Sequence, residues 1–153
     1  MIKILFVCHG NICRSPMAEF VMKDLVKKAG LADEFEIASA ATSREEIGNL
    51  VHLGTRRKLG EVGISCAGKT AIQMTKEDYR YYDYVIAMDA WNLRNIDRII
   101  GSDVDEKVSL LLEHAGISRD IADPWYTGNF EETYRDVVQG CTALLDKLCT
   151  EGI

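Results

Sequence analysis

The 153-residue sequence lacks several features that would assign it to particular classes of protein. It has only two prolines, and it shows no repeat, low-complexity stretch or linker, so we expect one domain over residues 1–153. No apolar run approaches the roughly 20 residues that a membrane span needs. The apolar stretch after Lys3 is also too short for a signal peptide and has no cleavage pattern. We therefore expect a cytoplasmic protein.

Basic residues are in deficit, with 18 Lys and Arg against 24 Asp and Glu, for a formal net charge of -6. Nucleic acids and anionic membranes need a basic face, so neither is expected as a partner. The five cysteines are an odd number without a CxxC pair, and the three histidines have no metal-ligand spacing. We expect reduced thiols, no metal and no cofactor.

Apolar runs alternate with amphipathic stretches along the chain, and this pattern predicts an α/β fold with a mostly parallel sheet. The first apolar run is almost uninterrupted, as in a strand that is buried on both faces. The predicted strands are Ile2 to Val7, Phe35 to Ala40, Tyr84 to Met88 and Val108 to Leu112.

Helices are predicted between these strands. In the first, Pro16 to Ala29, apolar residues recur at i, i+4 spacing, Glu19 falls in the predicted first turn, and Gly30 follows the end. An apolar stripe from Tyr134 to Leu148 predicts the last helix. Two more helices are expected over Leu50 to Val62 and Trp91 to Ile100, with a loop between Ala40 and Gly48.

The segment from Val7 to Pro16, VCHGNICRSP, carries the clearest chemical signal. It follows a buried strand and opens a helix, which is where open α/β sheets bind ligands. Gly10 and Asn11 adopt positive φ most easily, so the loop can curl and turn its N–H groups toward an anion. Pro16 suits the first position of the helix, whose dipole adds positive potential. The segment is neither the ATP-binding P-loop nor a dinucleotide fingerprint, because both glycine patterns are absent.

Three side chains of this loop form a phosphate pocket with a nucleophile at its base. A thiol at Cys8, beside the loop N–H groups and a cation, is expected to ionise more readily than a free cysteine. The planar fork of Arg14 can hold two phosphoryl oxygens, and Ser15 can donate a hydrogen bond to the thiolate.

The segment resembles the V-C-x-G-N-x-C-R-S-P motif of the low-molecular-weight protein tyrosine phosphatases. The resemblance extends to SAATS at residues 39–43, TKED at 75–78, Met88-Asp89 with Asn92, and DPWY at 123–126. It implies a single-domain three-layer sandwich, in which helices flank a four-stranded parallel sheet. It also implies phosphotyrosine proteins as substrates, a phosphocysteine intermediate and inorganic phosphate as the product.

The resemblance assigns further roles within the motifs. It makes Asp123 the general acid and base, and Pro124 would keep this residue extended in a loop. Trp125 and Tyr126 would flank a deep slot for the phenyl ring, although we expect one of the two to belong to the core.

Within the phosphate loop, Asn11 would maintain the shape and the backbone of His9, Gly10, Ile12 and Cys13 would surround the phosphate. His9 would be an exposed specificity residue. The family can form a reversible disulfide at the position of Cys13, so redox switching with Cys8 is a hypothesis. Cys141 lies on an apolar helical stripe and is predicted to be in the core.

Two segments depart from the family pattern. Many relatives place an aromatic residue near Glu45 as the opposite pocket wall, and an acidic residue there would disfavour acidic peptides or favour basic ones. Residues 67–70, AGKT, lack the His and Arg often found there, which puts a buried contact with Asp89 in doubt.

The sequence therefore predicts a metal-independent protein tyrosine phosphatase that acts as a monomer or weak homodimer. Three alternatives remain. Thioredoxin-coupled arsenate reductases use the same loop but need two more cysteines close together, whereas Cys66 stands alone between Cys13 and Cys141. Arginine phosphatases carry Thr at the position of Ile12. A phosphotyrosine-binding module without activity would have lost Cys8 or Asp123.

Overall fold

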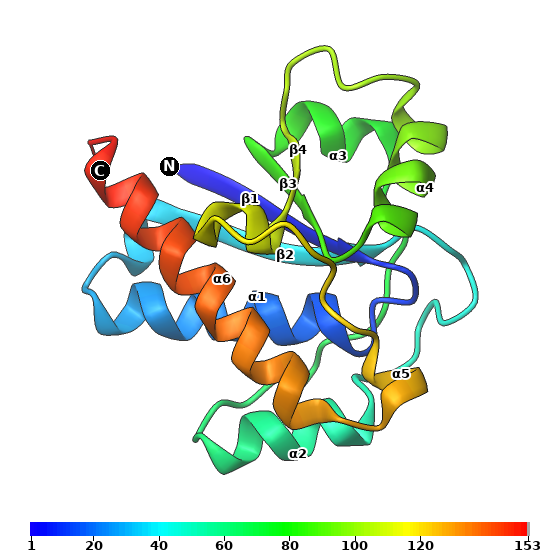
Figure 1. The fold of residues 1–153 in the computed structure, drawn as a ribbon, viewed down its shortest axis with the longest axis vertical. Coiled ribbons are helices and arrows are strands. Elements are labelled where there is room, and N and C mark those ends of the chain that lie inside the picture. The colour runs from blue at the N-terminus through cyan, green and yellow to red at the C-terminus, as the bar shows by residue number, and fades with distance from the viewer. Residues whose placement is uncertain (153) are drawn as a thin grey trace.

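The computed structural model of the chain describes residues 1–152, and its centre is a four-stranded sheet (Figure 1). The strands are β1 (Ile2–Cys8), β2 (Phe35–Ala41), β3 (Tyr84–Ala87) and β4 (Val108–Leu110). They are all parallel and lie in the order β2-β1-β3-β4. This arrangement confirms the predicted α/β fold with its four-stranded parallel sheet.

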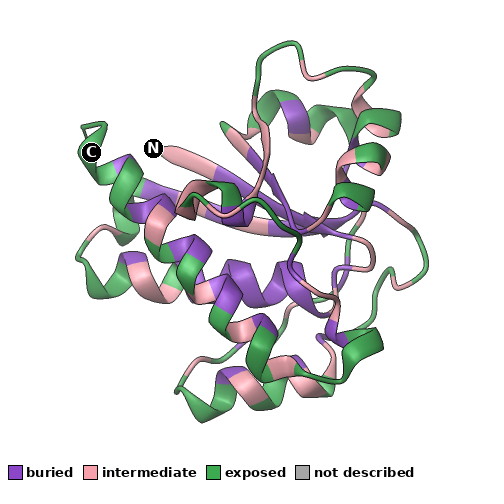
Figure 2. Ribbon diagram, viewed as in Figure 1, coloured by how far each residue is buried: buried purple, intermediate pink, exposed green. Residues whose placement is uncertain are grey.

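Helices cover both faces of the sheet, and the alternation of side chains along β1 shows how. Ile4 and Phe6 point to the face covered by α1 (Arg14–Lys28) and α6 (Phe130–Thr150). Leu5 and Val7 point to the other face, which α3 (Lys76–Tyr81) and α4 (Ala90–Ile100) cover. Figure 2 shows the buried residues concentrated in the strands and on the inner sides of α1 and α6. The central strand is apolar because both of its faces are covered.

The remaining elements are short, and several differ from the predicted bounds. They are α2 (Leu53–Glu61), α5 (Pro124–Thr127) and the 3₁₀ helices Ala32–Glu34 and Leu111–Ala115. The helix predicted from Leu50 begins only at Leu53, because the His52 Nδ1 atom caps it by accepting a hydrogen bond from the Gly54 N–H at 3.0 Å.

The strand predicted over Val108 to Leu112 ends at Leu110, since the next residues turn into a 3₁₀ helix. Leu111 packs so closely on α6 that a Cβ atom on Gly140 would lie 2.5 Å from the Leu111 Cγ atom. The apolar residues after Leu110 therefore serve packing against α6, not the sheet.

The first helix begins two residues earlier than predicted, at Arg14. Pro16 is therefore its third residue, where the missing N–H still leaves no intrahelical hydrogen bond unmade. The earlier start also corrects the interpretation of Glu19, which lies in the second turn and is buried. A buried carboxylate needs partners, so Glu19 is more than a favourable charge near a helix end.

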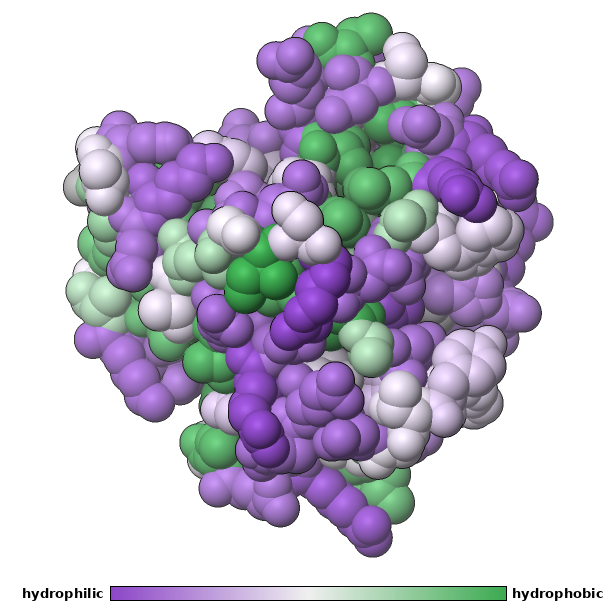
Figure 3. All heavy atoms as spheres, in the orientation of Figure 1, coloured by the Kyte–Doolittle hydropathy of each residue, from purple (hydrophilic) through white to green (hydrophobic). Residues whose placement is uncertain are grey.

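The carboxyl ends of the parallel strands meet at one edge of the sheet, where residues 9–13 and the segment before α5 come together (Figure 1). The face seen in Figure 3 is mostly hydrophilic, with smaller apolar patches between the polar side chains. Within residues 1–152, no helix combines the length and apolar character that crossing a membrane requires.

Candidate active site

The loop after β1 lies at the topological switch point of the sheet, because the chain pairs β1 with β2 on one side and with β3 on the other. Ligands of open α/β folds bind at this position. The loop carbonyl groups are hydrogen-bonded to its surroundings: Cys8 O accepts from Thr42 N at 2.9 Å, and Ile12 O accepts from His52 N at 2.8 Å. A loop whose carbonyls point outward can turn its N–H groups inward, as anion binding requires.

Asn11 shapes this loop through both its backbone and its side chain. Its φ is 59°, in the left-handed region, as predicted. Gly10 does not adopt positive φ, so that expectation was wrong. Its small size matters instead, because a Cβ atom there would lie 3.3 Å from the Glu46 Cγ atom. The Asn11 carbonyl Oδ1 accepts from Ile72 N at 3.2 Å and thereby fixes the amide orientation.

Cys8 is buried at the end of β1 with two polar neighbours. Its Sγ atom lies 3.0 Å from the Ser15 Oγ atom and accepts a hydrogen bond from the Asn11 N–H at 3.3 Å. Both neighbours can donate to sulfur, and donors of this kind stabilise a thiolate over a thiol.

Arg14 is buried beside the thiol and is shared by two carboxylates. Its NH1 atom donates to Asp89 Oδ2 at 2.7 Å and to Ile121 O at 2.9 Å, while NH2 lies 3.4 Å from Asp123 Oδ2. Burial works against the charge of the guanidinium, but Cys8 and the two aspartates outweigh it and raise the Arg14 pKa. The Nε atom is buried without a partner, so one donor of the fork is available to an incoming anion.

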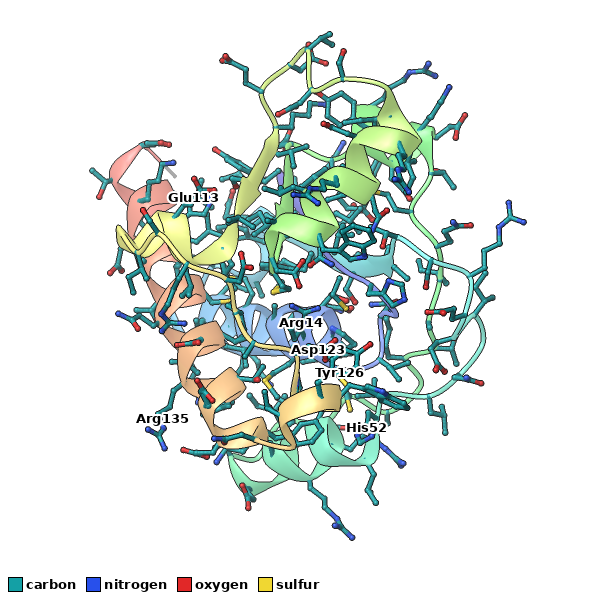
Figure 4. All side chains as sticks on the ribbon, turned by 45° about the vertical axis from the view of Figure 1, so that its right-hand side comes forward. Arg14, His52, Glu113, Asp123, Tyr126 and Arg135 are labelled. Carbon is teal, nitrogen blue, oxygen red and sulfur yellow. The ribbon has the colours of Figure 1, made fainter. Side chains whose placement is uncertain are left out.

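Asp123 occupies the N-cap of α5, and its two oxygens have different partners. Oδ1 accepts from Trp125 N at 3.0 Å, and Oδ2 faces Arg14. The residue is extended (φ -80°, ψ 114°), as the following Pro124 favours. Figure 4 shows Arg14 and Asp123 side by side, with Tyr126 next to them on α5.

These residues line a pocket of about 310 Å³. Its lining consists of Cys8, His9, Gly10, Ile12, Cys13, Arg14, Glu45, Glu46, Asp123, Trp125 and Tyr126. Trp125 and Tyr126 are 56% and 84% exposed, so the expectation that one of them belongs to the core was wrong. The four-residue helix α5 is too short to bury either side chain, and both line the pocket as exposed residues.

His9 and Glu45 contact each other through Nε2 and Oε2, and both residues line the pocket. Both side chains are solvent-accessible, so the contact can open without burying a charge. An acidic side chain thus forms part of the pocket lining at residue 45.

The cysteines differ in their surroundings. Cys13 lines the pocket next to Cys8, and burial, followed by the charge of Cys8, raises its pKa to about 12. Cys141 is fully buried on α6, as predicted, and burial raises its pKa. All five cysteines are free thiols. Among the described residues, no group of three or more His, Cys, Asp or Glu side chains is arranged to hold a metal ion.

The sequence did not indicate the place of Glu46 in the pocket, nor the contacts of Asp89 and Lys69. Glu46 lines the pocket but carries no signal beyond its neighbour Glu45. The carboxylate of Asp89, whose contact with residues 67–70 was in doubt, pairs with Arg14. Lys69 instead donates to Ser39 O at 2.8 Å and lies 3.8 Å from Glu19. The contacts of Asp89 and Lys69 join residues far apart in the sequence, so no local sequence pattern predicts them.

Known proteins resemble the chain over nearly its whole length. The model of the family described as low molecular weight phosphotyrosine protein phosphatase matches residues 3–152. The low molecular weight protein-tyrosine-phosphatase YfkJ of Bacillus subtilis (strain 168) is 42% identical over 153 residues, covering 99% of this chain and 98% of that protein. The crystal structure of YfkJ from Bacillus subtilis superposes with a TM-score of 0.96 at 41% identity, covering 100% of this chain and 98% of the other. The Homo sapiens low molecular weight phosphotyrosine protein phosphatase is 38% identical over 149 residues, or 94% of each chain. The chain therefore belongs to the low molecular weight phosphotyrosine protein phosphatase family.

Proposed function

We propose that the protein hydrolyses phosphotyrosine in proteins, and small aryl phosphates, in two steps through a phosphocysteine on Cys8. The observation that carries the proposal is the grouping of Cys8, Arg14 and Asp123 in one pocket with aromatic side chains at its mouth. Family membership supports the phosphatase activity, and the contacts of these residues support the mechanism.

In the first step, the Cys8 thiolate attacks phosphorus while the loop N–H groups and Arg14 hold the equatorial oxygens. The unpartnered Arg14 Nε atom supplies one donor, and NH2, whose contact with Asp123 is long at 3.4 Å, supplies the second. A bidentate grip of this kind requires Arg and not Lys. Protonated Asp123 gives its proton to the departing tyrosine oxygen.

In the second step, Asp123 takes a proton from water, and the water oxygen attacks the phosphorus of phosphocysteine. The S–P bond breaks, inorganic phosphate leaves, and Ser15 stabilises the thiolate by donating across the 3.0 Å separation. Activity then requires an ionised Cys8 and a protonated Asp123 together, so the rate should have a bell-shaped dependence on pH.

The pocket mouth supports selectivity for aryl phosphates. Trp125 and Tyr126 line the pocket and can stack on a phenyl ring. Because Cys8 is buried, we infer that a long phosphorylated side chain reaches it more easily than a short one. We also propose that Glu45 disfavours acidic residues beside the phosphotyrosine. Glu45→Gln should raise kcat/KM for acidic phosphopeptides and leave hydrolysis of para-nitrophenyl phosphate within twofold of wild type.

The arsenate reductase alternative needs two further cysteines near the nucleophile. Among the described residues, only Cys8 and Cys13 line the pocket, so Cys66 has no partner for such a relay there. Ile12 in the loop favours phosphotyrosine over phosphoarginine, and direct competition between the two substrates tests this preference.

The test is hydrolysis of para-nitrophenyl phosphate in the presence of a chelator, from about pH 5 to 8. Cys8→Ser should abolish turnover, and Asp123→Asn should slow it by roughly 10²- to 10⁴-fold. Cys149→Ser, at an exposed cysteine outside the pocket, is the matched control and should retain full activity. A folded wild-type protein without turnover would refute the proposed activity.

We propose reversible oxidation as a property of the same site. Peroxide would convert the Cys8 thiolate to a sulfenic acid, and Cys13 would displace water to form the disulfide. Because burial raises the Cys13 pKa to about 12, this second step should be slow at neutral pH and faster as pH rises. Without Cys13, further peroxide should oxidise the Cys8 sulfenic acid to the sulfinic acid, which thiols do not reduce. Thiol treatment after excess peroxide should therefore restore activity in the wild type but not in Cys13→Ser.

The free thiols also suit a reducing compartment, which supports the proposed cytoplasmic location. The monomer or weak homodimer stays a prediction, and sedimentation at several protein concentrations would test it.

A further inference from the structure

The proposed general acid, Asp123, is the last residue of a segment that forms neither helix nor strand, residues 117–123, which we call the acid segment. Such a segment has no regular ladder of backbone hydrogen bonds, so contacts with other elements must fix its position. A general acid has to lie within hydrogen-bond reach of the oxygen that it protonates, and a displacement of about 1 Å can cost roughly 10²-fold in rate. The contacts that hold the acid segment therefore bear directly on the proposed acid catalysis.

One side of the acid segment is attached to the end of β3 and the start of α4. The Ile121 N–H donates to the carbonyl of Met88, the residue after β3, at 2.9 Å. The Asp120 Oδ1 atom accepts from the Ala90 N–H at 3.1 Å. Ile121 is only 1% exposed, and its carbonyl accepts from the Arg14 NH1 atom at 2.9 Å. The backbone of the acid segment thus contacts the phosphate-binding arginine directly.

The other side of the acid segment is attached to α6 through two buried polar side chains of that helix. Asp136 accepts from both NH groups of the Arg119 fork, Oδ2 from NH1 and Oδ1 from NH2, each at 2.8 Å. The Arg119 NH1 atom also donates to Asp120 O at 3.2 Å. Thr133 lies three residues before Asp136, on the same face of α6, and its Oγ1 atom donates to Ala122 O at 3.1 Å. Successive carbonyls of the segment are therefore fixed.

The burial of Asp136 makes its ion pair with Arg119 more than a surface contact. The Asp136 side chain is 9% exposed and that of Arg119 52%, so the carboxylate is shielded while its partner reaches it from solvent. A buried carboxylate is costly unless it is paired, and the bidentate geometry is the one in which a partly exposed ion pair still contributes. Removing Arg119 would leave Asp136 without its cation and free the acid segment to shift away from α6.

We propose that the Arg119–Asp136 ion pair and Thr133 position Asp123 as the general acid by holding the acid segment against α6. The inference rests on the proposed function for its meaning in catalysis. Arg119, Thr133 and Asp136 do not line the pocket, so they are positioning residues that act through the backbone of the acid segment.

The test compares Arg119→Gln and Thr133→Val with Arg135→Gln as the matched control. Arg135 is also an arginine paired with an acidic residue of α6, but its contact with Glu131 lies within that helix. The first readout is the ratio of kcat/KM for para-nitrophenyl phosphate to kcat/KM for phenyl phosphate. Phenol is the more basic leaving group and depends more on the general acid, whereas partial unfolding lowers both values equally. The second readout is amide hydrogen exchange over residues 119–128, which needs no turnover.

We expect Arg119→Gln and Thr133→Val each to raise the ratio roughly tenfold, because a displaced acid protonates the leaving oxygen less effectively. Asp123→Asn gives the ratio of an enzyme without the acid. Hydrogen exchange over residues 119–128 should become roughly tenfold faster in both variants. Arg135→Gln should change neither the ratio nor the exchange. Thr133→Val replaces one hydroxyl with a methyl group of similar size and remains informative if Arg119→Gln fails to fold.

Folded Arg119→Gln and Thr133→Val with the same ratio as Arg135→Gln would overturn the inference, whether or not their hydrogen exchange is faster. A wild-type ratio equal to that of Asp123→Asn would instead refute the role of Asp123 as the general acid. Because hydrogen exchange does not depend on turnover, an inactive wild type with faster exchange in both variants would refute the proposed phosphatase activity and leave the attachment of the acid segment to α6 standing.

Discussion

Asp89 makes two contacts that mutation can separate, one with the Arg14 guanidinium and one with the N-terminus of α4. Its Oδ2 atom accepts from the Arg14 NH1 atom at 2.7 Å, whereas its Oδ1 atom accepts from Asn92 N at 2.7 Å and caps α4. Asp89→Asn keeps a capping oxygen and removes the charge. Asp89→Ala removes both.

The contacts set the expected magnitudes. Arg14 is 2% exposed and Asp89 18%, so the hydrogen bond between charged groups is shielded and its loss should cost about 2 kcal/mol. In a protein of this size, that lowers the melting temperature by roughly 4–8 °C. Loss of the cap in Asp89→Ala should add about 1 kcal/mol.

Activity should fall in both variants for a further reason. Without Asp89, the Arg14 guanidinium keeps Asp123 as its remaining carboxylate partner, so the contact now at 3.4 Å should tighten. A more strongly held Asp123 carboxylate is a poorer general acid, and kcat should fall roughly tenfold. Thermal unfolding and steady-state hydrolysis of para-nitrophenyl phosphate measure the two effects.

Thr75→Ala is the control, since Thr75 caps α3 in the same way and has no contact with Arg14. It should cost about 1 kcal/mol with unchanged kcat. An Asp89→Asn variant that lost no more stability than Thr75→Ala and kept the wild-type kcat would refute the role assigned to the Asp89–Arg14 contact.

Further predictions concern the pocket wall, packing and acid stability. Trp125→Ala should raise KM for aryl phosphates roughly three- to tenfold in steady-state assays, with a smaller change in kcat, because the side chain stacks on the ring and not on the reacting atoms. Gly54→Ala should lower the free energy of unfolding by about 2 kcal/mol, measured by thermal unfolding, because a Cβ atom there would lie 2.3 Å from the Phe130 ring. Gly60→Ala in the same helix is the control: its Cβ atom would meet no atom within 4 Å, so the change should be neutral or stabilising. Burial lowers the pKa of His114 in the folded protein. As pH falls below about 6.5, the unfolded chain therefore binds a proton at this histidine more readily than the folded protein does, and the free energy of unfolding should decrease. Melting temperatures between pH 8 and 5.5 should show a shallower decline for His114→Gln.

The loop after β1 could be predicted because its chemistry lies within a few consecutive residues at a strand-to-helix turn. Cys8 and Arg14 meet there by local geometry, and the apolar run of β1 identifies the buried strand before them. The position of Asp123 came from the resemblance of DPWY to a family motif, since no spacing in this sequence connects residue 123 with residue 8.

The wrong sequence predictions share a physical cause: tertiary contacts, and not the local sequence, determined the conformation or burial of the residue. Glu19 fits a favourable helix charge in the sequence, but the earlier helix start and its contact with Ser39 make it a buried partner of β2. Leu111 fits a strand, but it lies in a 3₁₀ helix and packs closely against Gly140 of α6. Trp125 was expected at either the wall or the core, and only the length of α5 decided between them.

With 24 Asp and Glu against 18 Lys and Arg, the chain must attract an anionic substrate against its net charge, and the contacts of Arg14 show how it can do so. Asp89 and Asp123 already face the buried guanidinium of Arg14, and Glu45 and Glu46 line the pocket, so the site without substrate carries little free positive charge. A phosphate dianion can displace Asp123 from Arg14 at least cost when Asp123 carries a proton. In the proposed mechanism, that proton is also the one that the leaving tyrosine oxygen requires. If Asp123 is the general acid, phosphate binding and acid catalysis both need it protonated. The carboxylate that would oppose the substrate when ionised would then be its proton donor when neutral.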